Sequence, residues 1–117
     1  MPLLDTNALI AVYKTKNKKE KTEKLFTTVL NVIEFPIASQ NDNLIILFPS
    51  PESYLKAIEY SSLLRNVGTP IAAIDIMIGV LALEHDLTIV TDDKDFSLLS
   101  KIEPKLLTIN VSAFLEI

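Results

Sequence analysis

Apolar and polar residues alternate along this chain in blocks that match short strands separated by helices. Five short apolar or β-prone runs predict strands, at residues 3–4, 24–27, 44–48, 87–90 and 106–109. Five longer stretches with helical spacing predict helices, at residues 8–13, 29–37, 51–66, 70–85 and 94–101. Parallel strands need crossover connections about as long as a helix, so the alternation predicts an α/β fold. We expect a three-layer α/β/α arrangement with a mainly parallel sheet of about five strands.

Local signals predict where several of these elements begin and how deep they lie. Thr6 and Asn7 are suited to cap the first helix, and Ser50 to cap the long helix that begins at residue 51. Pro70 predicts the start of the next helix. The apolar run at 44–48 is typical of a parallel strand buried inside a sheet.

The length and composition are those of one folded unit. The chain has 117 residues, of which 49% are hydrophobic and 22% charged, so we expect a single domain over residues 1–117. The first residues lack the pattern of a signal peptide, and the longest apolar stretch, at 71–83, is too short to span a bilayer. We therefore expect a cytoplasmic protein without membrane contacts.

The residue types that are missing limit the chemistry. The chain has no cysteine, which excludes disulfides, thiol nucleophiles and cysteine-based zinc sites. His85 is its one histidine, so a cage of several histidines is excluded too. Any bound metal must use oxygen ligands, which indicates a hard cation, Mg²⁺ or Mn²⁺.

Charge is unevenly distributed along the chain. The net charge is −4, which argues against a protein that binds polyanions over its whole surface. Six of the eleven basic residues nevertheless fall in one short segment: Lys14, Lys16, Lys18, Lys19, Lys21 and Lys24. This segment is either a solvated surface loop or a contact for a nucleic-acid backbone.

Four carboxylates stand where an apolar or small residue is the usual choice. Asp5 and Asp93 follow predicted strands, Asp75 lies in an almost wholly apolar helix, and Glu34 lies beside an apolar stripe. The carboxyl ends of parallel strands face one edge of a sheet, where such folds bind ligands. If the acids converge there, each raises the pKa of the others, and a divalent cation relieves the repulsion. Such a cation activates water for phosphodiester hydrolysis.

Each acid taken alone has a plainer interpretation. Asp5 is suited to cap a helix, Glu34 to lie on a solvated helix face, and Asp93 to form a turn. Asp75 is equally suited to a buried ion pair, with Arg65 or with a lysine. The nuclease interpretation depends on the four acids occurring together.

The four acids lie in four segments, which are LLDTNALI at 3–10, VLNVIEF at 29–35, GTPIAAIDIMIGVLA at 68–82 and VTDDKDF at 90–96. Together these segments resemble PIN domains, and in particular the toxins of VapBC-type toxin–antitoxin pairs. The resemblance covers nearly the whole chain, and the ordered set is more specific than any one piece.

The resemblance implies a PIN-like nuclease domain that acts as a Mg²⁺- or Mn²⁺-dependent endoribonuclease. It also implies an RNA substrate, an antitoxin partner and a homodimer. The metal-binding and catalytic residues would be Asp5, Glu34, Asp75 and Asp93. Around them, Asn7 and Thr91 would orient the acids by hydrogen bonds, and Asp95 would stand in for Asp93 if the register of the last motif differs.

Two other functions remain open from the sequence. A phosphatase of the haloacid-dehalogenase class also uses an aspartate at a strand end, but it needs a second aspartate two residues later, where this chain has Asn7. A non-catalytic PIN-like module would bind a partner without cleaving RNA.

Overall fold

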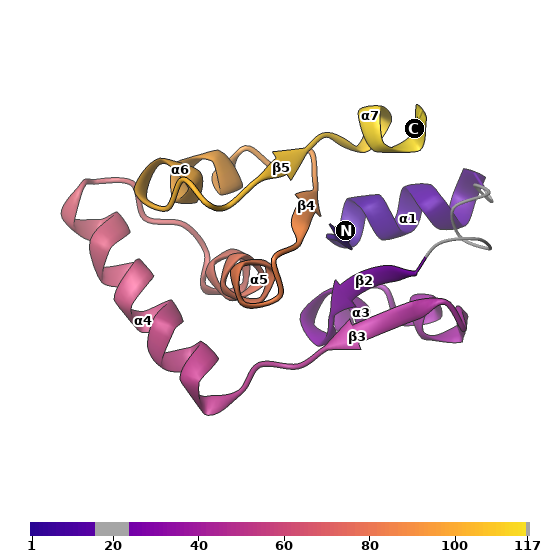
Figure 1. The fold of residues 1–117 in the computed structure, drawn as a ribbon, viewed down its shortest axis with the longest axis horizontal. Coiled ribbons are helices and arrows are strands. Elements are labelled where there is room, and N and C mark those ends of the chain that lie inside the picture. Colours follow the sequence, from indigo (N-terminus) through magenta and orange to yellow (C-terminus); the bar gives the residue numbers. More distant parts are fainter. Residues whose placement is uncertain (16–23, 117) are drawn as a thin grey trace.

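The computed structural model describes residues 1–15 and 24–116, and its strands and helices alternate as the sequence predicts (Figure 1). The elements follow in the order β1 (Pro2–Leu4), α1 (Thr6–Thr15), β2 (Leu25–Thr28), α3 (Val29–Glu34), the 3-10 helix η1 (Pro36–Gln40), β3 (Leu44–Leu47), α4 (Pro51–Asn66), α5 (Ala73–Glu84), β4 (Thr88–Val90), α6 (Asp95–Ile102), β5 (Thr108–Ile109) and α7 (Val111–Glu116).

The five strands form one sheet in the order β3-β2-β1-β4-β5, and every neighbouring pair is parallel. β1 is central, with Leu3 opposite Phe26 of β2 and opposite Ile89 of β4. From β1 the chain first builds one half of the sheet and then crosses to the other. The strand order therefore reverses between β1 and β4, which is the place where open parallel sheets bind ligands.

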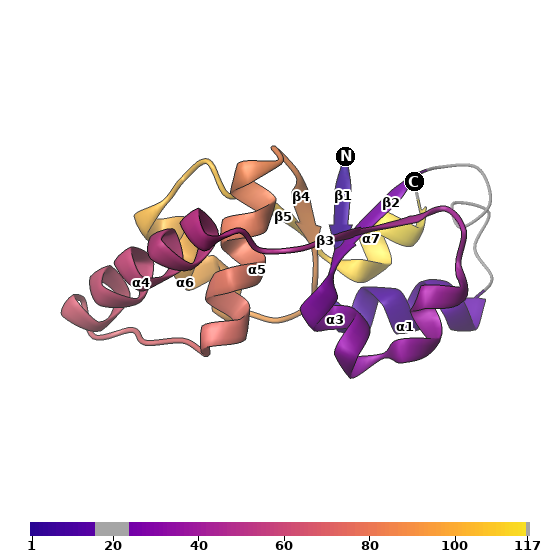
Figure 2. The same cartoon turned by 90° about the horizontal axis from the view of Figure 1, so that it is seen from below.

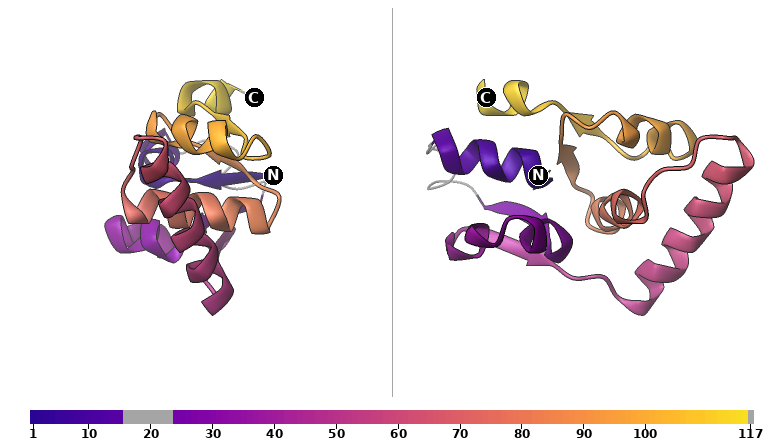
Figure 3. Two further views of the ribbon diagram at one scale, coloured as in Figure 1. Left: turned by 90° about the vertical axis from the view of Figure 1, so that its left-hand side faces the viewer. Right: turned by 180° about the vertical axis from the view of Figure 1, so that it is seen from behind.

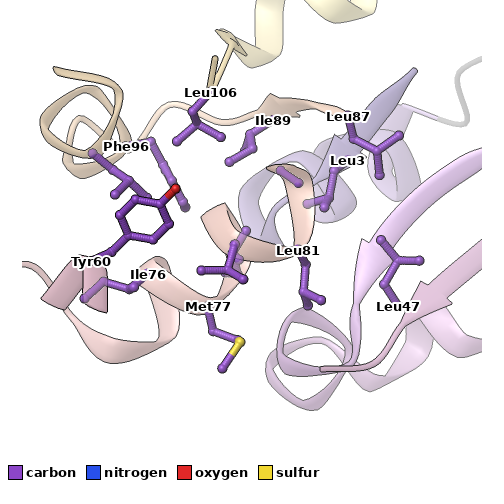
Figure 4. Packing of buried hydrophobic residues seen from close by; sticks show 14 of the residues in the cluster. Leu3, Leu47, Tyr60, Ile76, Met77, Leu81, Leu87, Ile89, Phe96 and Leu106 are labelled. Atoms are coloured by element: carbon purple, nitrogen blue, oxygen red, sulfur yellow. The ribbon is translucent and has the colours of Figure 1, made fainter. Parts of the chain in front are cut away.

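The sheet separates two hydrophobic clusters, because successive side chains of a strand point to opposite faces. Leu3 and Ile89 lie in the cluster packed with α4, α5 and α6, part of which is drawn in Figure 4. Leu4 and Val90 lie in the other cluster, packed with α1, η1 and α7. Helices thus cover both faces, and the predicted three-layer α/β/α fold is confirmed.

The long helix α4 and the first helix α1 lie far apart in the molecule. α4 lies at one end of the molecule and α1 at the other, as Figures 1 and 3 show. α4 has 16 residues and packs mainly against α5. None of the helices in residues 1–15 and 24–116 combines the length and the hydropathy that a bilayer-spanning segment needs.

Three local predictions differ from the structure, and one helix has no counterpart among the predicted elements. The segment 44–48 forms an edge strand instead of a buried one: Leu47 is its one buried residue, and Phe48 is 67% exposed. Helix α5 begins at Ala73, three residues after Pro70, because residues 69–72 first cross from α4. Asp5, and not Thr6 or Asn7, caps α1. The sequence does not predict the C-terminal helix α7, because its six residues carry too short an apolar pattern.

Candidate metal centre

The four predicted acids line one cavity of about 180 Å³. Asp5, Glu34, Asp75 and Asp93 share this cavity with Thr6, Asn7, Asn31 and Ile78. It lies beyond the carboxyl ends of β1 and β4, and Figure 2 shows α1 and α3 beyond the arrowheads of β1 and β2. Segments that are far apart in the chain therefore contribute carboxylates to a single site.

Asp5 joins β1 to α1 and is 7% exposed. Its backbone carbonyl accepts the first helical hydrogen bond, from Leu9 N at 2.9 Å. One side-chain oxygen, Oδ1, accepts from the backbone N–H groups of Asn7 at 3.1 Å and Ala8 at 3.4 Å. Asp5 is thus the cap of α1 and also a wall of the cavity. The side chain of Asn7 is exposed at the cavity rim, while its backbone N–H orients Asp5.

The loop after β4 is tied to Asp5 by a short series of hydrogen bonds. Thr91, which is 5% exposed, donates its hydroxyl to the second carboxylate oxygen of Asp5. The backbone N–H of Asp93 donates to Thr91 Oγ1 at 2.9 Å, and the N–H of Asp95 donates to Asp93 Oδ1 at 2.9 Å. Thr91 therefore links Asp5 to the loop that carries Asp93.

Asp75 lies in the first turn of α5, opposite the start of α6. One carboxylate oxygen from each of Asp75, Asp93 and Asp95 lies within 4.8 Å of the others. Asp95, predicted as a neighbour or a substitute, is thus grouped with Asp75 and Asp93, whereas Asp5 and Glu34 line the cavity outside this closest group. Asp75 is only half-buried, because the first turn of α5 faces solvent and Ile74 is 46% exposed. The buried part of α5 begins at Ile76.

Glu34, the last residue of α3, is held by a hydroxyl from α1. Thr6 Oγ1 donates to Glu34 Oε1 at 3.0 Å and accepts from Asn31 Nδ2 at 3.1 Å. Asn31 in turn accepts from the Thr28 hydroxyl at 2.7 Å. Sequence reasoning missed Thr6 and Asn31 as site residues. The available signal was a polar residue one helical turn before Glu34, a position that faces the same side of the helix.

No basic side chain of the described residues neutralises these acids. Within residues 1–15 and 24–116, the ion pair found at 4.0 Å or less joins Lys56 to Glu59. The alternative pairing of Asp75 with Arg65 or a lysine is therefore not seen there. Of the lysine-rich segment, Lys14 and Lys24 are exposed, and residues 16–23 lie outside the described residues.

Burial and mutual repulsion change how two of the acids titrate. Burial raises the pKa of Asp5, although hydrogen bonds from Thr91 and from two backbone N–H groups oppose the rise, and the charge of Asp93 adds to it. Burial and then the charges of its acidic neighbours, Asp93 first, raise the pKa of Asp75 to about 6. Both carboxylates are ionised near neutral pH only at an energetic cost.

This cost predicts a pH dependence of stability in the metal-free protein. The pKa of Asp75 is about 6 in the folded chain against 3.8 for the free residue, so the folded state binds more protons between these values. Stability contributed by the protonated group is therefore lost as the pH rises from about 4 to about 6. Asn does not titrate, so the Asp75→Asn variant should avoid this decrease in the free energy of unfolding. We expect the avoided decrease to be about 1 to 2 kcal/mol, allowing for solvent screening.

Urea unfolding at several pH values in the presence of a chelator measures this effect as the difference between wild type and variant. The difference should grow in favour of Asp75→Asn up to about pH 6 and then stay level. A difference that is constant from pH 4 to pH 7 would mean that the environment of Asp75 does not raise its pKa.

The donor set fits a hard divalent cation. The side chains that converge offer carboxylate oxygens and no sulfur or imidazole, and the hydroxyl and amide groups among them hydrogen-bond or flank these acids. Mg²⁺ and Mn²⁺ prefer such oxygen ligands and relieve the repulsion among like charges. A cavity of this size also leaves room for the water molecules that Mg²⁺ retains.

The fold is shared with solved structures of low sequence identity. A chain of VapBC-1 from nontypeable Haemophilus influenzae superposes with a TM-score of 0.72 at 18% identity, over 95% of this chain and 98% of that one. VapBC2 from Rickettsia felis, bound to a promoter DNA fragment, gives 0.68 at 20% identity, over 93% and 97%. A toxin–antitoxin complex from Klebsiella pneumoniae gives 0.67 at 17% identity, over 92% and 97%.

The sequence taken alone shows no significant similarity to known family models or curated proteins. The structure therefore reveals a likeness that overall sequence similarity does not. The chain has the fold of chains from VapBC and other toxin–antitoxin complexes, over nearly their whole length, and the fold predicted from its PIN-like motifs is confirmed.

Proposed function

We propose that this chain is a divalent-metal-dependent endoribonuclease of the PIN-domain kind, the toxin of a VapBC-type pair acting in the cytoplasm. The observation that carries the proposal is one cavity with four carboxylates, from the end of β1, α3, α5 and the loop after β4, and no basic side chain of the described residues to neutralise them. The shared fold supports it independently.

We assign the cation-binding role to Asp5, Glu34, Asp75 and Asp93, with Asp95 beside them. A Mg²⁺ or Mn²⁺ ion bound there would lower the pKa of a water molecule and stabilise charge on a phosphodiester oxygen. Thr91 and the backbone N–H groups of Asn7 and Ala8 hold the Asp5 carboxylate in one orientation before substrate arrives. Such fixed orientation lowers the cost of binding a cation and of positioning the reacting groups.

The direct test is cleavage of RNA by the purified chain with Mg²⁺ or Mn²⁺ and with excess chelator. We expect cleavage that requires the cation and returns when the cation is added back. A phosphatase would instead form an aspartyl-phosphate on Asp5 with a phosphate-ester substrate. A binding module would leave RNA intact and gain no thermal stability from Mg²⁺. Either result would contradict the proposed activity.

We further propose that an antitoxin and a second copy of the chain are its protein partners. The chains of similar fold include members of toxin–antitoxin assemblies. Helix α4 carries large apolar side chains without cover in the single chain, among them Tyr54, Leu55 and Ile58, the last 66% exposed. Tyr54 and Ile58 line an apolar hollow of about 340 Å³ between α4 and α5. Uncovered apolar surface of this kind marks interfaces.

We assign this face of α4 to the homodimer. Light scattering coupled to size exclusion should give twice the mass of the chain for wild type, and Ile58→Asp should shift the mass toward that of one chain, because a charge at the centre of an apolar contact is costly. Lys56→Asp is the matched control, because Lys56 lies on the same helix and its side chain forms a surface ion pair with Glu59. A wild-type monomer, or a dimer insensitive to Ile58→Asp, would contradict the assignment.

A further inference from the structure

Four polar side chains form a continuous line of hydrogen bonds that ends on Glu34. Thr28, the N-cap of α3, donates to Asn31 Oδ1 at 2.7 Å, and its hydroxyl oxygen accepts from Asn31 N at 3.3 Å. Asn31 Nδ2 donates to Thr6 Oγ1 at 3.1 Å, and Thr6 donates to Glu34 Oε1 at 3.0 Å. Asn31 is 1% exposed, so its amide has few other partners to choose from.

Hydrogen-bonding chemistry permits only one direction for this line. An ionised carboxylate accepts and does not donate, so the single proton of the Thr6 hydroxyl must point to Glu34. Thr6 must then accept from its other neighbour, which turns the NH₂ group of Asn31 toward it. The amide oxygen of Asn31 is left for the Thr28 hydroxyl. The amide of Asn31 thereby commits the Thr6 proton to Glu34.

Glu34 needs such a restraint more than Asp5 does. Asp5 is buried and held through both of its carboxylate oxygens, whereas Glu34 is exposed and stands at the end of a six-residue helix. A free glutamate side chain loses considerable rotamer entropy when it is fixed in one geometry. The Thr6 bond is made to Oε1, so among residues 1–15 and 24–116 Oε2 is left for a cation in the cavity that Glu34 lines.

We propose that Thr6 and Asn31 are positioning residues, which hold Glu34 ready to bind the divalent cation. This inference rests on the proposed function, because it concerns the cation that the acids are proposed to hold. It adds to the roles of Asp5, Asp75 and Asp93 a separate support from α1 and α3, which acts through Glu34 and does not touch the cation. The line of hydrogen bonds depends on a hydroxyl at position 6 and on an amide at position 31.

The test is the affinity of the purified full chain for Mn²⁺, measured by titration calorimetry, with thermal unfolding in chelator as the record of folding. Thr6→Val removes the hydroxyl and keeps the shape, and we expect about a tenfold weaker affinity. Thr6→Ser keeps the hydroxyl and should bind Mn²⁺ with an affinity within about twofold of wild type. Asn31→Leu removes the amide and should also weaken binding about tenfold.

Thr15→Val is the matched control, because Thr15 lies on the same helix and its hydroxyl bonds to backbone carbonyls of α1. It should bind Mn²⁺ as wild type does. If Thr6→Val binds as tightly as wild type, or if Thr6→Ser fails to restore binding, the positioning role is wrong while the metal site stands. A purely structural role would lower the unfolding temperature and leave the affinity unchanged. If wild type itself binds no Mn²⁺, the proposed function fails, and this inference with it.

Discussion

Asp75→Asn is expected to reduce RNA cleavage about a hundredfold or more at saturating Mg²⁺. The side chain keeps its size and loses the charge that, with Asp93 and Asp95, forms the closest group of carboxylates in the described residues. Loss of residues that merely support metal ligands costs about 10- to 100-fold, so loss of a ligand should cost no less. The measurement is the initial rate of cleavage near neutral pH against Mg²⁺ concentration.

Asp92→Asn is the control for this variant, because it changes the same charge one residue from Asp93. The Asp92 side chain is not part of the cavity lining and accepts a hydrogen bond from Val111 N at 3.0 Å. This variant should cleave RNA at nearly the wild-type rate. An Asp75→Asn chain that is folded and as active as wild type would remove Asp75 from the proposed site.

Gly79→Val is expected to destabilise the protein by about 3 kcal/mol and to weaken cation binding with it. Gly79 lies one turn beyond Asp75 on α5, where a β-carbon would overlap the Cδ2 methyl of Leu99. Leu99 is fully buried and lies one turn beyond Asp95 on α6. A valine therefore forces α5 and α6 apart where their first turns bring the acids together. Urea unfolding and Mn²⁺ titration measure the two effects.

The other glycine of the chain provides the comparison. Gly68 has φ of +78° at the end of α4, and apart from its two chain neighbours no described residue has an atom within 4 Å of the position that an added β-carbon would take. Gly68→Ala therefore costs only the backbone strain, about 1 to 2 kcal/mol, and should leave Mn²⁺ affinity unchanged. A stable Gly79→Val chain would mean that α5 and α6 do not need this close approach.

The regular elements were predictable where a local signal sets them. Ser50 marks the start of α4 and Gly68 marks its end. Both signals are local, because a capping serine and a glycine with positive φ act on residues only a few positions away. The edge position of β3 was not predictable, since apolar runs of this kind occur in central and edge strands alike. Its neighbours in space, not its own sequence, leave Phe48 exposed.

The acids of the site were predictable because a carboxylate is conspicuous beside apolar residues. Their partners were less so. Thr91 followed from its place in the last motif, whereas Thr6 and Asn31 meet only because α1 and α3 pack side by side. Asp95 joins Asp75 through the approach of α5 to α6, which depends on contacts far apart in the chain. Pairings of this kind are properties of the tertiary fold.

The most direct test of the central claim is a crystal structure of the chain grown with Mn²⁺, with anomalous scattering used to locate the ion. We predict an anomalous peak in the cavity lined by Asp5, Glu34, Asp75 and Asp93, ligated by carboxylate oxygens from these residues. Crystals with an open cavity and no peak there at saturating Mn²⁺ would contradict the claim, as would a lysine or arginine side chain occupying the centre of the four acids.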